Sequence, residues 1–196
     1  NLSTSVAVTG GLVGGGNEFQ HTYCGLDEVP QEGKAIVIGF YGRDIHVRYG
    51  AVGGWDVFGP KRTITKAVKN VLFELDNQPA LALYKTYLGE KAAELPGSGL
   101  LFPLSLDLHT DSGEGVVRTI LAVNEEEQSI TFAGDMPVGV SAQLMKANFD
   151  RLVGGAADAA DMVIKESKTQ SLAILISCIG RKLVLRDRIE EETEAV

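Results

Sequence analysis

The sequence predicts an α+β fold, with mostly antiparallel or mixed sheets of short strands, a few packed helices and two subdomains. Three observations lead to this prediction. Short stretches rich in β-branched residues alternate in polarity and are separated by glycine-rich turns, as in strands that pair with their sequence neighbours. Two longer stretches carry apolar residues at helical spacing. The overall pattern is rich in strands, with meanders of short strands and a few long helices, which is typical of an α+β protein.

Alternating segments in the first 50 residues indicate strands, because valine, isoleucine, threonine and tyrosine fit a pleated, half-buried surface. These segments are Ser3 to Thr9, Gln20 to Gly25, Lys34 to Phe40 and Asp44 to Tyr49. The chain is expected to stay extended from Thr63 to Leu75. We place a subdomain boundary near Val68.

Helix signals are clearest in two places. Pro79 to Leu88 is predicted to be a helix, because proline fits a first helical turn and Gly89 can end the helix in a left-handed conformation. Asn148 to Val163 is predicted to be an amphipathic helix with Asn148 as its cap. Further strands are expected at Gly99 to Leu108, Val116 to Val123, Gln128 to Ala133, Val138 to Met145 and Leu172 to Ser177, and a last helix at Gly180 to Val196.

Composition limits the classes of partner. The 196 residues carry a net charge of -8, which nucleic acid and anionic membrane surfaces repel. The chain has two cysteines, far apart, so a reducing cytoplasm is the expected compartment. No apolar run approaches the ~20 residues of a membrane span. Because Asn1 is not a start methionine and no glycine or proline ends the last predicted helix, we expect a chain cut from a longer protein.

The glycine-rich loop Gly10 to Gly16 does not match a nucleotide-binding loop. It lacks the Gly-x-Gly-x-x-Gly spacing and the following Lys-Ser or Lys-Thr of a phosphate-binding loop. It is either a turn that needs unusual backbone angles or a loop that lines a ligand. The three histidines, His21, His46 and His109, have no metal-ligand spacing. A single imidazole is nevertheless sufficient as an axial haem ligand.

Cys178 and Arg181 stand at the start of the last predicted helix. A thiol there would have its pKa lowered by the helix start and by the arginine, although a small buried filler is the alternative. Arg181 either binds an anionic ligand group together with the helix N–H groups or forms a salt bridge. The run Glu190 to Glu194 is predicted to be a solvated helix face. Trp55, the one tryptophan, either anchors irregular backbone or stacks on a ligand.

No paired carboxylates, nucleophile elbow or kinase motifs can be assigned, so no catalytic residue and no metal ligand is predicted. The predicted ligand-binding residues are those of the glycine loop, the tryptophan and the helix start. They are Gly10, Gly11, Gly14, Trp55, Cys178 and Arg181.

Five strings, in their order and spacing, resemble the FIST domain family, the F-box and intracellular signal transduction proteins. They are GWDVFGPKRTIT (54–65), NVLFELDNQPALALYKTYLG (70–89), GLLFPLSL (99–106), FAGDMPVGV (132–140) and SCIGRKLVL (177–185). Residues 1 to 66 resemble the end of the family's N-terminal region, and residues 67 to 196 resemble a truncated C-terminal region.

The resemblance implies a bacterial-type sensory module in the cytoplasm. Such a module would bind a small molecule, with amino acids and other small anions among the suggestions, and pass its state to an output domain such as a histidine kinase or chemoreceptor. No cofactor, nucleic acid or membrane insertion is expected. Some relatives bind haem and respond to nitric oxide, so a haem-based gas sensor is one alternative. An enzyme that uses Cys178 and a plain interaction domain are the others.

Overall fold

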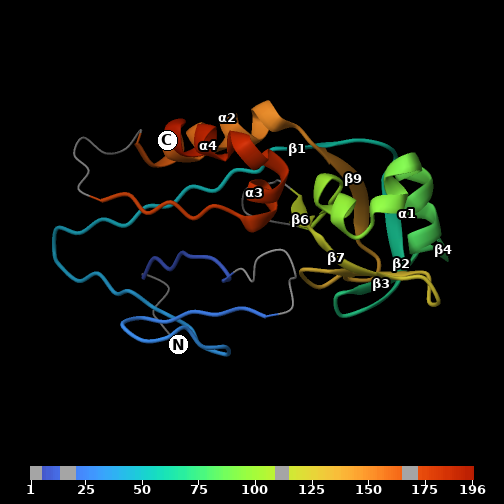
Figure 1. Ribbon diagram of the computed structural model, residues 1–196, viewed down its shortest axis with the longest axis horizontal. Helices are drawn as coiled ribbons and strands as arrows, with labels where there is room; N and C mark the ends of the chain where they lie inside the picture. The colour runs from blue at the N-terminus through green and yellow to red at the C-terminus, as the bar shows by residue number, and fades with distance from the viewer. Residues whose placement is uncertain (1–5, 14–20, 109–114, 165–171) are drawn as a thin grey trace.

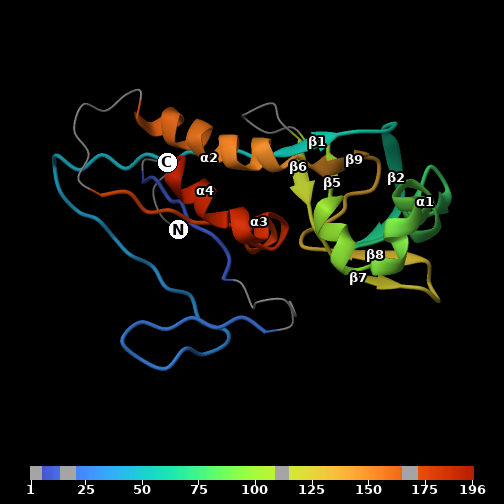
Figure 2. The same ribbon diagram turned by 45° about the horizontal axis from the view of Figure 1, so that its top comes forward.

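The computed structural model describes residues 6–13, 21–108, 115–164 and 172–196 (Figures 1 and 2). Within these residues, nine strands form one sheet in which every pair is antiparallel, and helices pack beside it. The predicted α+β class with a mostly antiparallel sheet is confirmed.

The main path of the sheet runs in the order β6-β5-β9-β2-β3-β8-β7, while β1 pairs with β9 and β4 pairs with β3. The two ends of this path, β6 and β7, are joined in the chain by Thr119 alone. The sheet therefore curls until it is nearly a barrel. The strands are β1 (Trp55–Val57), β2 (Arg62–Val68), β3 (Val71–Leu75), β4 (Gln78–Pro79), β5 (Leu104–Leu106), β6 (Val116–Arg118), β7 (Ile120–Asn124), β8 (Ser129–Phe132) and β9 (Ser141–Ala147).

Short polar turns join neighbouring strands. Asp76 and Asn77 both have positive φ, the requirement of the tight turn between β3 and β4, and aspartate and asparagine tolerate this conformation. At the tip between β7 and β8, the Asn124 side chain accepts hydrogen bonds from the backbone N–H groups of Glu126 and Glu127, both at 3.0 Å. The strands β7 and β8 therefore form an antiparallel hairpin with an acidic tip.

Helix α1 (Ala80–Leu88) closes one end of the curled sheet (Figure 1). Pro79 precedes it, and Gly89 follows with φ 57, as the sequence predicts. Its buried side chains join the main core with residues of β2, β3, β5, β7, β8 and β9. The Tyr84 hydroxyl donates to the Phe102 carbonyl at 2.7 Å inside this core.

A helical layer beside the sheet contains α2 (Phe149–Ile164), α3 (Ile179–Leu185) and α4 (Ile189–Glu194), around a second small core of Leu152, Val184 and Leu185. The described part of the chain also contains three 3₁₀ turns, at Gly89–Glu94, Gly97–Leu101 and Arg186–Arg188. Asn148 caps α2 as predicted, because its side-chain oxygen accepts from the Arg151 N–H at 3.2 Å. Its amide also donates to Asp56 of β1 at 2.9 Å, which ties the helical layer to the sheet.

Residues 50–54 run directly along α2, and glycines make this approach possible. A β-carbon on Gly50 would lie 2.3 Å from the Ala159 carbonyl oxygen, and one on Gly155 would lie 2.5 Å from the Gly53 carbonyl oxygen. Larger residues at these positions would push the segment off the helix.

Four predicted strands are wrong for the described residues. The segments 21–25, 34–40, 44–49 and 172–177 contain no strand, and residues 6–9 of the first predicted strand contain none either. The pairing found among these residues is an isolated bridge, in which Cys24 and Gln31 exchange backbone hydrogen bonds of 3.1 and 2.9 Å. Alternating polarity predicts which side chains would share one face of a strand. A strand also needs a neighbouring backbone to pair with, and the alternation does not specify that partner.

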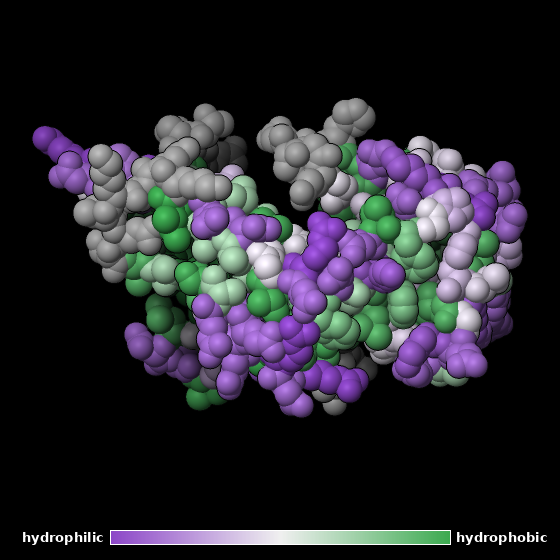
Figure 3. All heavy atoms as spheres, turned by 90° about the horizontal axis from the view of Figure 1, so that it is seen from above, coloured by the Kyte–Doolittle hydropathy of each residue, from purple (hydrophilic) through white to green (hydrophobic). Residues whose placement is uncertain are grey.

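These segments keep many apolar side chains exposed, among them Val37, Ile38, Tyr49 and Leu172. Figure 3 shows apolar and polar residues interspersed on the face seen from above.

Two later predictions also need correction. The expected strand Gly99–Leu108 begins as a 3₁₀ turn and becomes a strand only at Leu104–Leu106. The expected helix Gly180–Val196 exists but is interrupted, because α3 ends where Arg186 adopts a positive φ of 51°.

Candidate functional site

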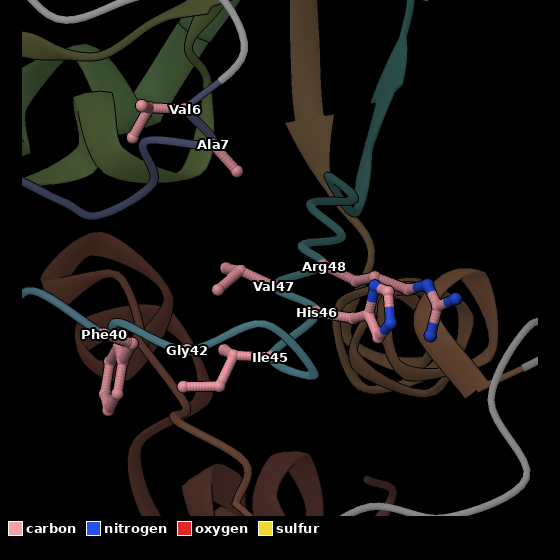
Figure 4. A pocket seen from close by; sticks show the side chains of 8 residues that line it. All are labelled: Val6, Ala7, Phe40, Gly42, Ile45, His46, Val47 and Arg48. Atoms are coloured by element: carbon pink, nitrogen blue, oxygen red, sulfur yellow. The ribbon is translucent and has the colours of Figure 1, made fainter.

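A cavity of about 360 Å³ lies between the extended segments 6–7 and 40–48 (Figure 4). Its lining combines apolar and basic side chains from these two segments. They are Val6, Ala7, Phe40, Gly42, Ile45, His46, Val47 and Arg48. A second cavity, between α1 and the sheet, has about 20 Å³, room for no more than a water molecule. Of these two cavities, only the first has the size of a ligand site.

His46 and Arg48 supply the polar part of the large cavity. They are two residues apart in extended chain, so their side chains leave the backbone on the same side. Figure 4 shows them pointing one way, and Ile45 and Val47 pointing the other. A guanidinium beside an imidazole can bind an anion on one side of the segment, and Ile45 and Val47 present an apolar surface on the other side.

The glycine loop lies close to the C-terminal part of the chain. A β-carbon on Gly11 would lie 3.1 Å from Cγ2 of Ile176, so these two distant segments run next to each other. Gly10 has a φ of 157, a value that residues with a side chain rarely adopt, and no neighbour within 4 Å of an added β-carbon. The predicted site residue Gly14 lies outside the described residues.

Trp55 is half-buried in β1 and packs against the second core. Its indole Nε1–H donates to the Leu100 carbonyl at 3.4 Å. These contacts are those of a ring that anchors irregular backbone. Stacking of Trp55 on a ligand stays a prediction.

Cys178 is exposed and immediately precedes α3. The Arg181 guanidinium, whose charge would stabilise a thiolate, is engaged elsewhere: its Nε lies 2.5 Å from Oε1 of Glu192. Arg181 is therefore not free to act as the cationic neighbour of Cys178 in this arrangement.

Arg181 itself is 7% exposed, as is Glu192. Its Nη1 donates to the Val52 carbonyl at 3.1 Å and its Nη2 donates to the Leu152 carbonyl. The contact of Nε with Glu192 is an ion pair without hydrogen-bond geometry. The structure thus has the salt bridge that the sequence left open for Arg181, and ligand binding by this residue stays a prediction. Glu192 is also the exception to the solvated face predicted for Glu190 to Glu194.

The structure brings some predicted residues into one region. Trp55 and Arg181 border the same small core around Leu152, and Gly11 contacts the segment that leads to Cys178. Sequence reasoning missed Arg48 and treated His46 as isolated. The signal was present, since strict alternation in DIHVRY (44–49) already places His46 and Arg48 on one face.

The described residues contain no group of three or more His, Cys, Asp or Glu side chains that could hold a metal ion. His109 lies outside these residues. Among the described helices, none combines the length and the apolar composition needed to cross a bilayer.

Comparison with known families assigns the class of protein. FIST domains are sensory domains of signal transduction proteins and are sensory rather than catalytic. The FIST N domain matches residues 1–78 and the FIST C domain matches residues 80–196, so this chain belongs to the FIST family. Comparison with curated proteins and with solved structures gave no match.

Proposed function

We propose that this sensory chain binds a small carboxylate in the cavity between residues 6–7 and 40–48. The observation that carries the proposal is the combination of size and lining. A volume of about 360 Å³ lies within the usual range of small-molecule sites, which are mostly apolar with a few placed polar groups.

The lining favours a carboxylate with a short apolar body, a class that includes amino acids. Arg48 offers a planar fork of donors that fits a carboxylate, and His46 adds a donor next to it. Val6, Phe40 and Ile45 supply the apolar part of the lining. Because the chain has a net charge of -8, this basic pair is a local feature and selects anions only inside the cavity.

Ligand binding would act by a population shift. The ligand stabilises the arrangement in which segments 6–13 and 40–48 enclose it, and a separate output domain, such as a histidine kinase or chemoreceptor, responds to that arrangement. Gly10 and Gly11 continue the segment that carries Val6 and Ala7, and Ile176 next to Gly11 links this segment to residues 172–178. Predicted ligand contacts at Gly10, Gly11 and Cys178 would follow from a ligand that extends in this direction.

Titration calorimetry with glutamate, leucine, acetate and benzoate tests the proposal on the full chain. We expect saturable binding of at least one, weakened about tenfold or more by His46→Gln or Arg48→Gln, because each loses a hydrogen bond to a charged group. Arg43→Gln is the matched control, since Arg43 is an exposed arginine of the same segment outside the cavity lining. No binding of any of the four, or equal weakening by Arg43→Gln, would contradict the proposal.

A haem-binding gas sensor is a second candidate because the imidazole of His46 lines this cavity. Haem added to the purified chain would then give the visible absorption spectrum of a histidine-ligated haem. His46→Gln would change this spectrum and His21→Gln would leave it unchanged. His21 is a suitable control because its Nδ1 lies 2.6 Å from Glu32, away from the cavity. A chain that takes up no haem rules this candidate out.

A further inference from the structure

Arg181 joins four parts of the chain through one side chain. Its Nη1 binds the Val52 carbonyl, 129 residues earlier in sequence, and its Nη2 binds the Leu152 carbonyl in α2. Its Nε pairs with Glu192 of α4 at 2.5 Å. The other carboxylate oxygen of Glu192 accepts from the Ser177 hydroxyl at 2.8 Å.

Burial makes this network selective for arginine. Arg181 and Glu192 are both 7% exposed, and removing two charges from water is costly unless each finds several partners. A guanidinium can donate in three directions from one plane, whereas an ammonium is a compact point charge on a flexible stem. A lysine in place of Arg181 would therefore not hold Val52, Leu152 and Glu192 at once.

The network reaches the cavity through the backbone. Val52 follows the cavity residue Arg48 by four positions, and four residues span at most ~14 Å. Gly50 and Gly54 lie on either side of Val52, and β-carbons there would lie 2.3 and 2.5 Å from backbone atoms of α2. The Val52 carbonyl is thus held where the segment meets the helix, and its position limits where His46 and Arg48 can lie.

We propose that Arg181 is a positioning residue: it holds the cavity segment 45–52 against α2 and, through Glu192, couples the position of that segment to α4. The proposal rests on the function proposed above, since it explains how a change at the cavity reaches the last helix of the chain. Displacement of segment 45–52 from α2 and local unfolding of α4 are then thermodynamically coupled, so that each makes the other more favourable.

Hydrogen exchange measured by mass spectrometry tests this without any ligand, so its outcome is separate from that of the carboxylate titrations. The variant Arg181→Met/Glu192→Leu replaces both charges by apolar groups, a change that buried ion pairs often tolerate. We expect amides of residues 45–52 to exchange about tenfold faster in this variant, while those of β2 and β3 keep their rates.

A second substitution separates coupling from simple stabilisation. Gly50→Ala inserts a methyl group against the Ala159 carbonyl and should speed exchange in both 45–52 and α4. In the Arg181→Met/Glu192→Leu background it should speed exchange in 45–52 alone, because the link to α4 is gone. A structural role of Arg181 without coupling predicts the same response of α4 in both backgrounds.

Arg188→Gln/Glu191→Gln is the matched control. It removes an ion pair that also links α2 and α4, with Arg188 at 3.1 Å from Asp150 and 2.7 Å from Glu191, but that does not touch Val52. The proposal is overturned if this control speeds amide exchange in residues 45–52 as much as the Arg181 variant does. It is also overturned if the Arg181 variant leaves the exchange rates of these residues unchanged. Should the double variant not fold, Arg181→Lys keeps the charge for Glu192 and must still accelerate exchange in 45–52.

Discussion

Arg62 ties the start of β2 to α1 and to the turn after β3. Its Nη2 donates to the Tyr87 hydroxyl at 2.7 Å and its Nη1 donates to Asp76 at 3.0 Å. The other oxygen of Asp76 accepts from the Thr63 N–H at 2.8 Å. The hydrogen bond from Thr63, followed by that from Arg62, lowers the pKa of Asp76 below its usual value.

This lowered pKa predicts a pH dependence of stability. A carboxyl with a lower pKa in the folded state stabilises the fold above its unfolded pKa, and this contribution is lost as the pH falls through the folded pKa. The stability difference between the parent chain and Asp76→Asn should therefore narrow as the pH falls from about 5 to about 3. Denaturant unfolding at several pH values measures it, with the hairpin-tip variant Glu126→Gln as control. A difference that stays constant with pH would show that the Asp76 charge contributes nothing.

Tyr84 is the buried phenol of α1, at 2% exposure, and burial raises its pKa so that the hydroxyl stays neutral. Tyr84→Phe removes the donor to the Phe102 carbonyl and should lower the free energy of unfolding by about 1–2 kcal/mol. Tyr41→Phe, at a position 90% exposed, should leave it unchanged. Urea unfolding of both variants provides the comparison, and equal stabilities would mean that water replaces the lost bond.

The contacts of several single residues could not be predicted from the sequence. The sequence offered salt bridge and ligand contact as equal alternatives for Arg181, because nothing local says which of the many acids faces it. Glu192 turns inward while it stands in a run of glutamates that any helical pattern assigns to solvent. The cavity residues His46 and Arg48 belong to a segment whose spatial neighbour, residues 6–7, is about 40 positions away, and that distance carries no sequence signal.

Helix α2 is the element on which the helical layer depends. It contacts the glycine segment 50–54 through Gly155, caps itself through Asn148 and accepts Arg181 at Leu152. The sequence predicted α1 and α2 well, because caps, proline and glycine signals are local. It failed for the segments between 20 and 50, because strand formation depends on partners elsewhere. The division into residues 1–66 and 67–196 stays a prediction.

The adjacent glycines of α2 allow a paired test of this packing. Gly155→Ala places a methyl group 2.5 Å from the Gly53 carbonyl oxygen and should destabilise the chain by about 1–3 kcal/mol. Gly154→Ala meets nothing within 4 Å and should stabilise it by up to about 1 kcal/mol, because alanine favours a helix over glycine. Thermal unfolding distinguishes the two. If both variants changed the melting temperature in the same direction, the result would contradict the close contact between α2 and residues 50–54.

The molecule as a whole exposes 13329 Å², whereas a compact chain of 196 residues exposes about 9,000 Å². The difference reflects uneven packing. The curled sheet and α1 enclose a large core, whereas residues 21–49 are almost entirely exposed. Stability should therefore be lowest in the part of the chain that carries the cavity, which is typical of regions that respond to ligands.

Limited proteolysis tests this uneven stability. Trypsin should cleave after Lys34 and Arg43, which are exposed, well before Lys66 in β2 or Arg118 in β6. A carboxylate that binds the cavity should slow cleavage at Arg43. Binding stabilises the folded arrangement of this segment by mass action, and trypsin cleaves the segment when it opens. Mass spectrometry of the early fragments identifies the sites. First cleavage at Lys66 or Arg118 would mean that the sheet is the less stable part.

The central claim is that the cavity beside His46 binds a small carboxylate, and proton NMR of the histidine side chains tests it most directly. His46→Gln assigns the His46 ring signal by its disappearance. Titration with a carboxylate that binds in calorimetry should shift this signal saturably and leave that of His21 in place, since His21 lies outside the cavity lining. A His46 signal that stays unmoved while the carboxylate binds, or that moves together with His21 by the same amount, would contradict the account.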